Sequence, residues 1–368
     1  MTNDSLNVFL PTFGKRPKVI VGRDKEIADF LDALKGQPGH PHRATFFIGQ
    51  RGMGKTALLL ELAVRAKSMG FVVARVTASE NMLSEIIEEI QHQGAKYVKD
   101  TRQKIKGVNA GALGFAFGLT FSEATEKQYG FRVKLSMLCE KLAKHGKGIL
   151  FLIDEMQTSS AVMREFATTY QQLVGDDCNV AVAMAGLPYA VLSVLNDNLL
   201  TFLNRAHKVH LSSLPLNEVS IFYAKVFAEA NVKIGAKDLE VAVSATKGYP
   251  YLMQLIGYYI AQANCGRKVI SNEQVVTAIT NARRNLEEDL FAPVMRLLSE
   301  KDKLFLKAMA VDKTLSKVSD IKQRLKVSSA YIQPYRRRLM AADIIVSPSR
   351  GQLEFRIPYL GEYLRGEL

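Results

Sequence analysis

One eight-residue stretch, Gly-Gln-Arg-Gly-Met-Gly-Lys-Thr at residues 49–56, constrains this chain more than any other. An apolar run at residues 44–48 precedes it, and residues 57–69, with apolar side chains at helical spacing, follow it. The glycines let the backbone curl until successive N–H groups point at one anion, and the start of a helix adds the positive end of its dipole. The pattern G-x-x-x-x-G-K-T between a strand and a helix is therefore typical of a loop that binds nucleotide phosphates.

The side chains of this loop have separate expected roles. Lys55 is expected to contact the β- and γ-phosphates, and the Thr56 hydroxyl to bind Mg²⁺. The other positions expected to surround the phosphates are Gly49, Gln50, Arg51, Gly52, Met53, Gly54 and Ala57. A glycine-rich turn without a ligand is the alternative interpretation. Because the sequence has no N-K-x-D guanine signature, ATP with Mg²⁺ is the expected ligand.

A second pattern is an apolar run at residues 148–153 that ends in the acidic pair Asp154 and Glu155. On a strand beside a phosphate loop, Asp154 would bind Mg²⁺ through water, and Glu155 would orient or deprotonate the attacking water. A strand that merely ends in acidic turn residues is the alternative. Together the two patterns predict an ATPase.

The spacing of apolar residues predicts an α/β core. Strand candidates are residues 44–48, 71–76, 148–153, 180–185 and 208–211. Helical segments separate them, which predicts a P-loop core with a five-stranded, mostly parallel sheet covered on both faces. The ligand of such a sheet is expected at the carboxyl ends of its strands.

The rest of the chain is expected to form further domains. We expect an N-terminal tail at residues 1–18, the core at 19–213 with an inserted hairpin at 107–122, an all-helical lid at 214–290, and a C-terminal winged helix-turn-helix at 291–368. The last assignment rests on three helical segments followed by two short strand candidates, an order in which the third helix can enter a major groove.

Charge and composition narrow the expected partners and the compartment. The net charge is +13, and residues 300–368 carry 14 Lys and Arg against 8 Asp and Glu, which favours a polyanionic partner. The three cysteines lie far apart and match no metal-binding spacing, which favours a reducing compartment. With no secretion signal and no membrane span in the sequence, we expect a cytoplasmic protein.

The expected recognition helix, residues 331–341, is crowded with side chains that suit nucleic acid. The candidate DNA-contact residues are Gln333, Tyr335, Arg336, Arg337, Arg338 and, at the tip of the expected wing, Arg350. Arginine pairs with guanine edges and with phosphates. Three consecutive arginines spread over about 200° of a helix and cannot all face one groove. A winged helix that contacts protein is the alternative.

The order of these motifs resembles the archaeal-type ATPases, prokaryotic relatives of the origin-recognition initiators and of the STAND signalling ATPases within the AAA+ group. The motifs are Val21-Gly22-Arg23-Asp24, the phosphate loop, Leu152-Ile153-Asp154-Glu155, Ala185-Gly186-Leu187-Pro188, Gly248-Tyr249-Pro250-Tyr251 with Gln254, and the winged helix.

This resemblance implies roles for four further residues. Val21, Gly22 and Arg23 would line the adenine, and Arg205 would be an arginine finger that completes a neighbour's site in a homo-oligomer. A simple lead-in to a helix and an exposed arginine at a helix end are the respective alternatives.

Two positions depart from the family pattern. The fourth strand ends Met184-Ala185-Gly186 without a polar side chain to sense the γ-phosphate, and residues 248–254 contain no lid arginine. Hydrolysis is therefore expected to be slow or dependent on a partner. The expected function is a nucleotide-driven switch on double-stranded DNA. The alternatives are a signalling or defence ATPase whose C-terminal module binds protein, and a nucleotide-binding protein without turnover.

Overall fold

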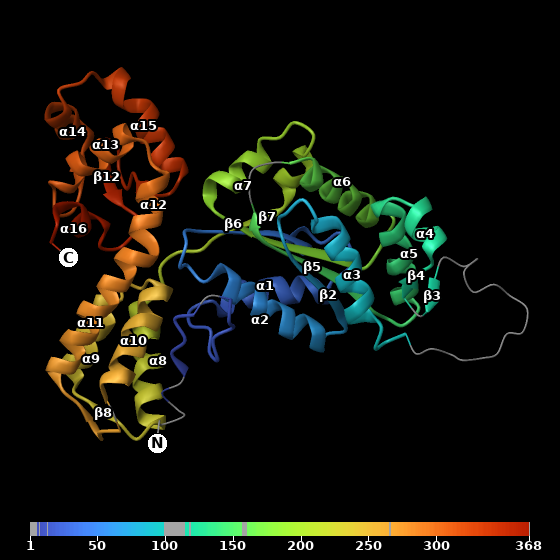
Figure 1. Cartoon of the computed structure of the whole chain (residues 1–368), viewed down its shortest axis with the longest axis horizontal. Helices are drawn as coiled ribbons and strands as arrows, with labels where there is room; N and C mark the ends of the chain where they lie inside the picture. The colour runs from blue at the N-terminus through green and yellow to red at the C-terminus, as the bar shows by residue number, and fades with distance from the viewer. Residues whose placement is uncertain are drawn as a thin grey trace, which may run out of the picture. The chain divides into compact units, whose positions relative to one another are not determined.

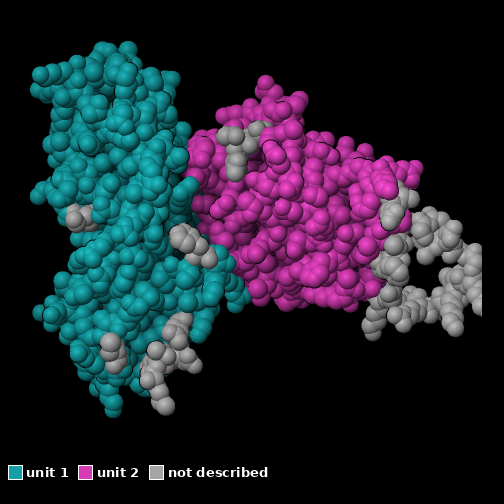
Figure 2. Space-filling view, in the orientation of Figure 1, with its two compact units in different colours: residues 1–22, 49–54, 211–368 teal, residues 23–48, 55–210 magenta. Residues whose placement is uncertain are grey.

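A computed structural model of the chain describes residues 6, 8–12, 14–98, 115–117, 119–156, 160–264 and 266–367 (Figure 1). Residue contacts divide it into two compact units (Figure 2). Unit 1 combines residues 1–22, 49–54 and 211–368, and unit 2 combines residues 23–48 and 55–210. The glycine-rich loop is thus grouped with the C-terminal part of the chain, while its flanking strand and helix belong to unit 2.

Unit 2 is built on a five-stranded sheet in the order β2, β5, β6, β1, β7, with every pair of neighbours parallel. The strands are β1 (Ala44–Ile48), β2 (Phe71–Thr77), β5 (Gly148–Met156), β6 (Val180–Gly186) and β7 (His207–His210). Four of these strands are mostly buried and apolar, as parallel strands covered on both faces are, whereas no residue of the edge strand β7 is buried. The expected α/β class and the parallel sheet are confirmed.

Helices cover both faces of this sheet (Figure 1). On one face, apolar side chains from four helices join the strands in a single core: α3 (Met82–Gly94), α5 (Phe131–Ala143), α6 (Ala161–Gly175) and α7 (Pro188–Leu195). On the other face lie α1 (Asp24–Lys35) and α2 (Lys55–Ser68), and the Phe30 and Phe47 rings lie 6.3 Å apart there. Short elements complete the unit: η2 (Pro41–Arg43), α4 (Glu123–Gln128) and η4 (Thr201–Arg205).

A small hairpin occupies part of the expected insertion. Strand β3 (Phe115–Phe117) pairs antiparallel with β4 (Thr120–Phe121). Residues 107–114 and 118 of the expected hairpin lie outside the described residues. Two cysteines of unit 2, Cys139 and Cys178, are free thiols.

The lid region of unit 1 consists of four helices and two very short strands. The helices are α8 (Leu216–Glu229), α9 (Ala236–Ala245), α10 (Pro250–Asn264) and α11 (Asn272–Leu286). The strands β8 (Lys233–Ile234) and β9 (Val269–Ile270) form a parallel pair that the all-helical prediction did not include. Two residues are too few for a strand to reveal its period in the sequence.

The segment expected to be an N-terminal tail is anchored on the lid. Phe9 is buried, and its ring centroid lies 5.7 Å from that of Phe222 and 5.5 Å from that of Tyr223. The backbone N–H of Leu10 donates to Oε1 of Gln254 at 2.9 Å. This part of the segment is therefore not a free tail. The apolar residues around Phe9 form too short a run to give a periodic signal from which the anchor could be predicted.

The helix α11 continues through a π-helical stretch, Glu287–Phe291, into α12 (Ala292–Leu297), so the boundary expected at residue 290 lies inside a continuous helix. Beyond it lie α13 (Glu300–Ala310), α14 (Val318–Leu325), α15 (Ser329–Ala341) and α16 (Leu360–Arg365). A three-stranded antiparallel sheet accompanies them, formed by β10 (Ser316–Lys317), β12 (Gln352–Phe355) and β11 (Ile345–Val346). No helix among the described residues is long and apolar enough to cross a bilayer.

Candidate functional site

The register of the sheet brings the two nucleotide motifs to one edge. Ile48, the last residue of β1, pairs with Gly186 of β6, and Met156 at the end of β5 pairs with the same glycine from the other side. Because neighbouring strands lie 4.7–4.9 Å apart, the ends of β1 and β5 are about 10 Å apart. The glycine-rich loop and the acidic pair therefore leave the same carboxyl edge of the sheet.

The acidic pair lies on a β-bulge. Between Ile153 and Met156 the register of β5 shifts against β6, so that β5 has one residue more than its partner strand. Glu155 adopts a left-handed backbone conformation, with φ of 51°, and its side chain is exposed. Its N–H donates to Oδ1 of Asp154 at 2.9 Å. Bulges redirect side chains, and left-handed non-glycine residues gather at functional sites, so this geometry singles out Glu155.

The end of β6 carries no polar side chain. All residues of β6 are buried, and a Cβ atom added at Gly186 would lie 2.9 Å from Cβ of Met156. Any side chain at position 186 would therefore force the neighbouring end of β5 to shift. The glycine lets β5 and β6 approach each other beside the bulge.

The loop itself is tightly curled. Gly52 and Gly54 have φ values of 78° and 82°, which side chains with a Cβ atom rarely adopt. The N–H of Met53 donates to the carbonyl of Gln50 at 3.3 Å, and the Met53 side chain is buried. Lys55 and Thr56 open the helix α2 directly after the loop.

Two lid residues hold the carbonyl groups of this loop. The hydroxyl of Tyr249 donates to the carbonyl of Arg51, and the N–H of Tyr251 donates to the carbonyl of Gly52 at 3.2 Å. A Cβ atom at Gly52 would lie only 2.8 Å from Cε1 of Tyr249, so this glycine also admits the tyrosine ring. The sequence had indicated the Gly-Tyr-Pro-Tyr motif only through its resemblance to a family, without a role for either tyrosine.

A third contact reaches the loop from the C-terminal region of unit 1. The side-chain amide of Gln50 donates to the carbonyl of Ala342, which follows α15. The Gln50 side chain is buried. Residues far apart in the sequence thus meet at the loop within unit 1.

The residues expected to line the adenine fall into different surroundings. Gly22 has a φ of 64° and lies beside the start of α8. A Cβ atom added to it would be 3.1 Å from side-chain atoms of both Leu214 and Glu218. Val21 is half-buried, and Arg23 is buried with Nη1 3.8 Å from Oε1 of Glu26.

Arg205 lies near the opposite end of the sheet from the glycine-rich loop. It ends η4, two residues before His207, which pairs with Thr45 near the start of β1. The three steps from Thr45 to Ile48 span about 10 Å of strand, so His207 is about that far from the carboxyl edge, and Arg205 precedes it in the chain. Its side chain is exposed. It therefore does not join the acidic pair within one chain.

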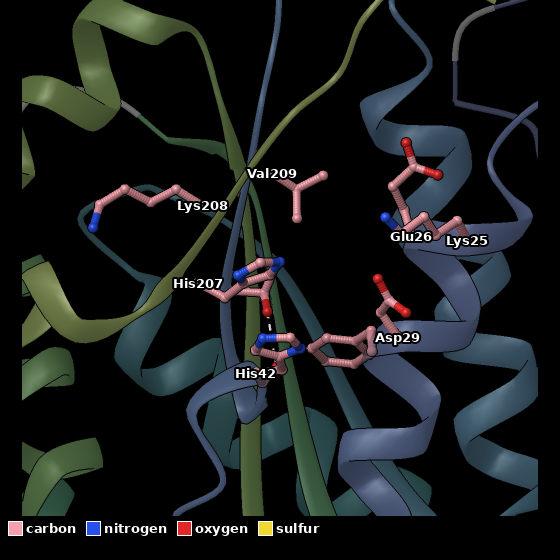
Figure 3. A pocket seen from close by; sticks show the side chains of 9 residues that line it. Lys25, Glu26, Asp29, His42, His207, Lys208 and Val209 are labelled. Carbon is pink, nitrogen blue, oxygen red and sulfur yellow. Dashed lines mark hydrogen bonds between the residues drawn. The ribbon is translucent and has the colours of Figure 1, made fainter.

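A separate cavity of about 240 Å³ lies in unit 2 at the edge strand β7 (Figure 3). The rings of His42 and His207 stack there with centroids 3.9 Å apart. Burial, and then the nearby His42, lower the pKa of His207 below its ordinary value. Since Thr45 and His207 belong to the amino ends of their strands, this cavity is away from the carboxyl edge. Among the described residues, no group of three or more His, Cys, Asp or Glu is placed to hold a metal ion.

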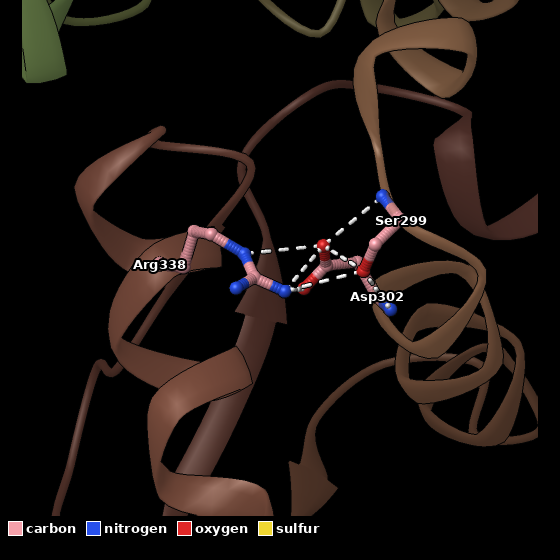
Figure 4. Close-up of polar contacts among 3 residues, drawn as sticks. All are labelled: Ser299, Asp302 and Arg338. Atoms are coloured by element: carbon pink, nitrogen blue, oxygen red, sulfur yellow. Dashed lines mark hydrogen bonds and ion pairs between the residues drawn. The ribbon is translucent and has the colours of Figure 1, made fainter.

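One of the arginines expected to contact DNA is engaged inside the C-terminal region. Nη2 of Arg338 lies 2.6 Å and 2.7 Å from the two carboxylate oxygens of Asp302, and Nε lies 3.1 Å from Oδ2 (Figure 4). Asp302 is 1% exposed and forms a capping box with Ser299 at the start of α13. Arg338 therefore joins α15 to α13 through its guanidinium, while its side chain stays exposed, and its expected DNA contact stays a prediction.

The other candidates on α15 and the wing differ in exposure. Nε of Arg336 is buried, and the Tyr335 ring packs against Tyr331 with centroids 5.5 Å apart. Gln333 is half-buried. Arg337 and Arg350 are exposed, as is Arg338 despite its ion pair.

We expect Arg338→Ala to lower the free energy of unfolding by about 2 kcal/mol, because it leaves the Asp302 carboxylate buried without its cation. The loss is smaller than for a fully buried pair, since the Arg338 side chain is 53% exposed. Urea unfolding followed by circular dichroism measures it. Arg337→Ala, on the same helix but exposed, is the control and should change stability by less than about 0.5 kcal/mol. Equal losses in the two variants would contradict the role of the ion pair.

Comparisons with known proteins agree with this architecture. A Walker-type ATPase of Pyrococcus abyssi superposes with a TM-score of 0.71 at 16% identity, covering 97% of this chain and 99% of that one. The ORC2 protein of Aeropyrum pernix, as its ADPNP–ADP complexes, gives a TM-score of 0.63 at 13% identity, covering 97% and 95%.

The comparisons of sequence give one match, to the C-terminal part of the chain. Residues 288–364 match a domain of unknown function, DUF8462, and no curated protein matches the chain. At such low identities, structural likeness establishes the fold alone. The chain has the fold of the archaeal Walker-type and ORC-like P-loop ATPases.

Proposed function

We propose that the chain is an ATP-binding and ATP-hydrolysing switch that acts on double-stranded DNA. The observation that carries this proposal is the common exit of the glycine-rich loop and the acidic pair from one edge of the sheet, on either side of Gly186. The ends of β1 and β5 lie about 10 Å apart within unit 2, a spacing that suits a triphosphate with its metal and attacking water.

Each residue of this edge would have one task. Lys55 would contact the β- and γ-phosphates, while Thr56 and Asp154 would hold Mg²⁺, Asp154 through water. Because Mg²⁺ keeps several waters and binds through few protein ligands plus phosphates, the lack of a three-ligand cluster among the described residues fits this arrangement. The bound Mg²⁺ would neutralise charge on the phosphates. Glu155 would orient the attacking water and accept its proton.

Two further groups would complete the site. Val21, Gly22 and Arg23 would line the adenine base. Arg205, exposed and at the other end of its own sheet, would act on the nucleotide of a neighbouring copy, where a cation stabilises charge on the transferred phosphoryl group. This role requires a homo-oligomer. Titration calorimetry with ATP, ADP and GTP in the presence of Mg²⁺ tests the proposal, and the absence of any adenine nucleotide uptake would end it.

The DNA side of the proposal rests on the winged helix-turn-helix, in which Arg337 and Arg350 are exposed. Log affinity falls linearly with log salt concentration, and each phosphate contact makes this slope steeper by about one. Arg337→Ala and Arg350→Ala should therefore each weaken duplex binding and reduce that slope by about one. Fluorescence anisotropy over a range of salt concentrations measures both effects.

The control for this experiment is Arg296→Ala, which removes an exposed arginine from α12, away from α15 and the wing in the sequence. It should leave the slope unchanged. A chain that shows no salt-dependent binding to any duplex would contradict the DNA proposal.

One observation favours a second candidate function, binding of a protein by the C-terminal region. The guanidinium of Arg338 is used by Asp302, and part of Arg336 is buried, which leaves α15 with few free side chains for reading bases. A signalling or defence ATPase would use this region in that way. A nucleotide-binding protein without turnover is distinguished by the hydrolysis rate of the wild-type chain.

A further inference from the structure

The lid holds two consecutive carbonyl groups of the glycine-rich loop through one segment of chain. Tyr249 donates its hydroxyl to the carbonyl of Arg51, and Tyr251 donates its backbone N–H to the carbonyl of Gly52. The ring of Tyr249 also lies against Gly52, where a Cβ atom would be 2.8 Å from Cε1. These contacts all lie within unit 1.

The chemistry of Tyr249 suits a permanent donor. Its side chain is 1% exposed, so water cannot readily replace its hydrogen bond. Burial, and then the nearby Asp343, raise the pKa of the hydroxyl above its ordinary value, which keeps the proton on the oxygen. The segment around it is fixed as well, because its N–H donates to the carbonyl of Thr246 at 2.8 Å.

A carbonyl that is held fixes the direction of the next amide group. The peptide bond is planar and trans, so a C=O and the N–H that follows it point in opposite directions. Holding the carbonyl of Arg51 therefore points the N–H of Gly52 away from Tyr249. The N–H of Met53 already donates to the carbonyl of Gln50, so Gly52 is the amide that this contact orients. In a loop of this kind, backbone N–H groups are the donors that phosphate oxygens meet.

We propose that Tyr249 is a positioning residue for the glycine-rich loop, which its hydroxyl preorganises for the phosphates of a nucleotide. The inference deepens the proposed function and depends on it for the identity of the ligand. It also makes the lid a determinant of phosphate affinity through contacts with the loop rather than through a charged side chain, since residues 248–254 contain no arginine.

Tyr249→Phe tests the inference because it removes only the hydroxyl and leaves the ring against Gly52. Losing one neutral hydrogen bond should weaken MgATP and MgADP binding about fivefold. The amides of residues 49–54 should exchange hydrogen faster in the nucleotide-free variant than in the wild type. If the chain turns over, KM for ATP should rise while kcat stays unchanged, because the contact does not depend on the transition state.

A matched variant separates positioning from general lid stability. Tyr223 is fully buried and donates its hydroxyl to the carbonyl of Met253 at 2.6 Å, so Tyr223→Phe removes the same kind of bond without touching the loop. This variant should change neither the exchange of residues 49–54 nor the nucleotide affinity.

The outcomes distinguish the inference from the proposed function. Unchanged exchange of residues 49–54 in Tyr249→Phe would overturn the inference, and so would an equal effect of Tyr223→Phe on exchange and affinity. A wild-type chain that binds no adenine nucleotide would overturn the proposed function, whereas faster loop exchange confined to Tyr249→Phe would still support the positioning role.

Discussion

Glu155→Gln should slow ATP hydrolysis about 10²–10⁴-fold, the usual contribution of a general base, while nucleotide binding persists. Glutamine keeps the size of the side chain and can still contact a water, but it cannot accept the proton. Glu155 is suited to this role because the bulge in β5 holds its backbone in a left-handed conformation at the carboxyl edge of the sheet. Single-turnover hydrolysis with MgATP, together with calorimetry on the same samples, measures rate and binding separately.

The control for this experiment is Glu165→Gln, which removes an exposed carboxylate from α6. It should hydrolyse ATP at the wild-type rate. Equal, measurable rates in the wild type and in Glu155→Gln would assign the proton transfer to another group. Equal rates near zero would instead favour a nucleotide-binding protein that does not turn over.

Lys55→Ala should weaken MgATP binding by about 100-fold, which corresponds to about 3 kcal/mol, the upper range for a hydrogen bond to a charged group. Lys55 is the first residue of α2, where the positive end of the helix dipole favours an anion. The loss should be larger for ATP than for ADP, because in the proposed site the lysine would contact the γ-phosphate as well as the β-phosphate. Competition against a fluorescent nucleotide measures both affinities.

Lys67→Ala provides the matched control, since Lys67 lies in the last turn of the same helix, 12 residues and about 18 Å away. It removes the same charge from α2 without reaching the loop. If Lys55→Ala and Lys67→Ala bound MgATP equally well, the glycine-rich loop would not be a triphosphate site. Thermal unfolding of the free variants shows whether either substitution acts through stability.

The interactions that the sequence did not predict share one property. Phe9 on the lid, Arg338 on Asp302, and Tyr249 on the loop each join residues that are far apart in the chain. Neither partner of such a pair carries a local signal of the other. The arginines at 336–338 show this limit of sequence-based prediction. Helical geometry predicts that their side chains diverge, but only the packing of α15 on α13 determines which one binds the buried carboxylate of Asp302.

The local features of the chain could be predicted from its residues alone. They are the loop of residues 49–56, the acidic pair after an apolar strand, and the five strands of the sheet. Glycine conformation, apolar period and motif spacing all act within a few residues, so they can be read along the chain. Three features became known only from the folded structure: the bulge at Glu155, the position of Arg205 near the amino ends of the strands, and the hydrogen bonds from the lid to the loop. Those features depend on the register between strands and on partners up to about 200 residues away, and a linear pattern does not specify them.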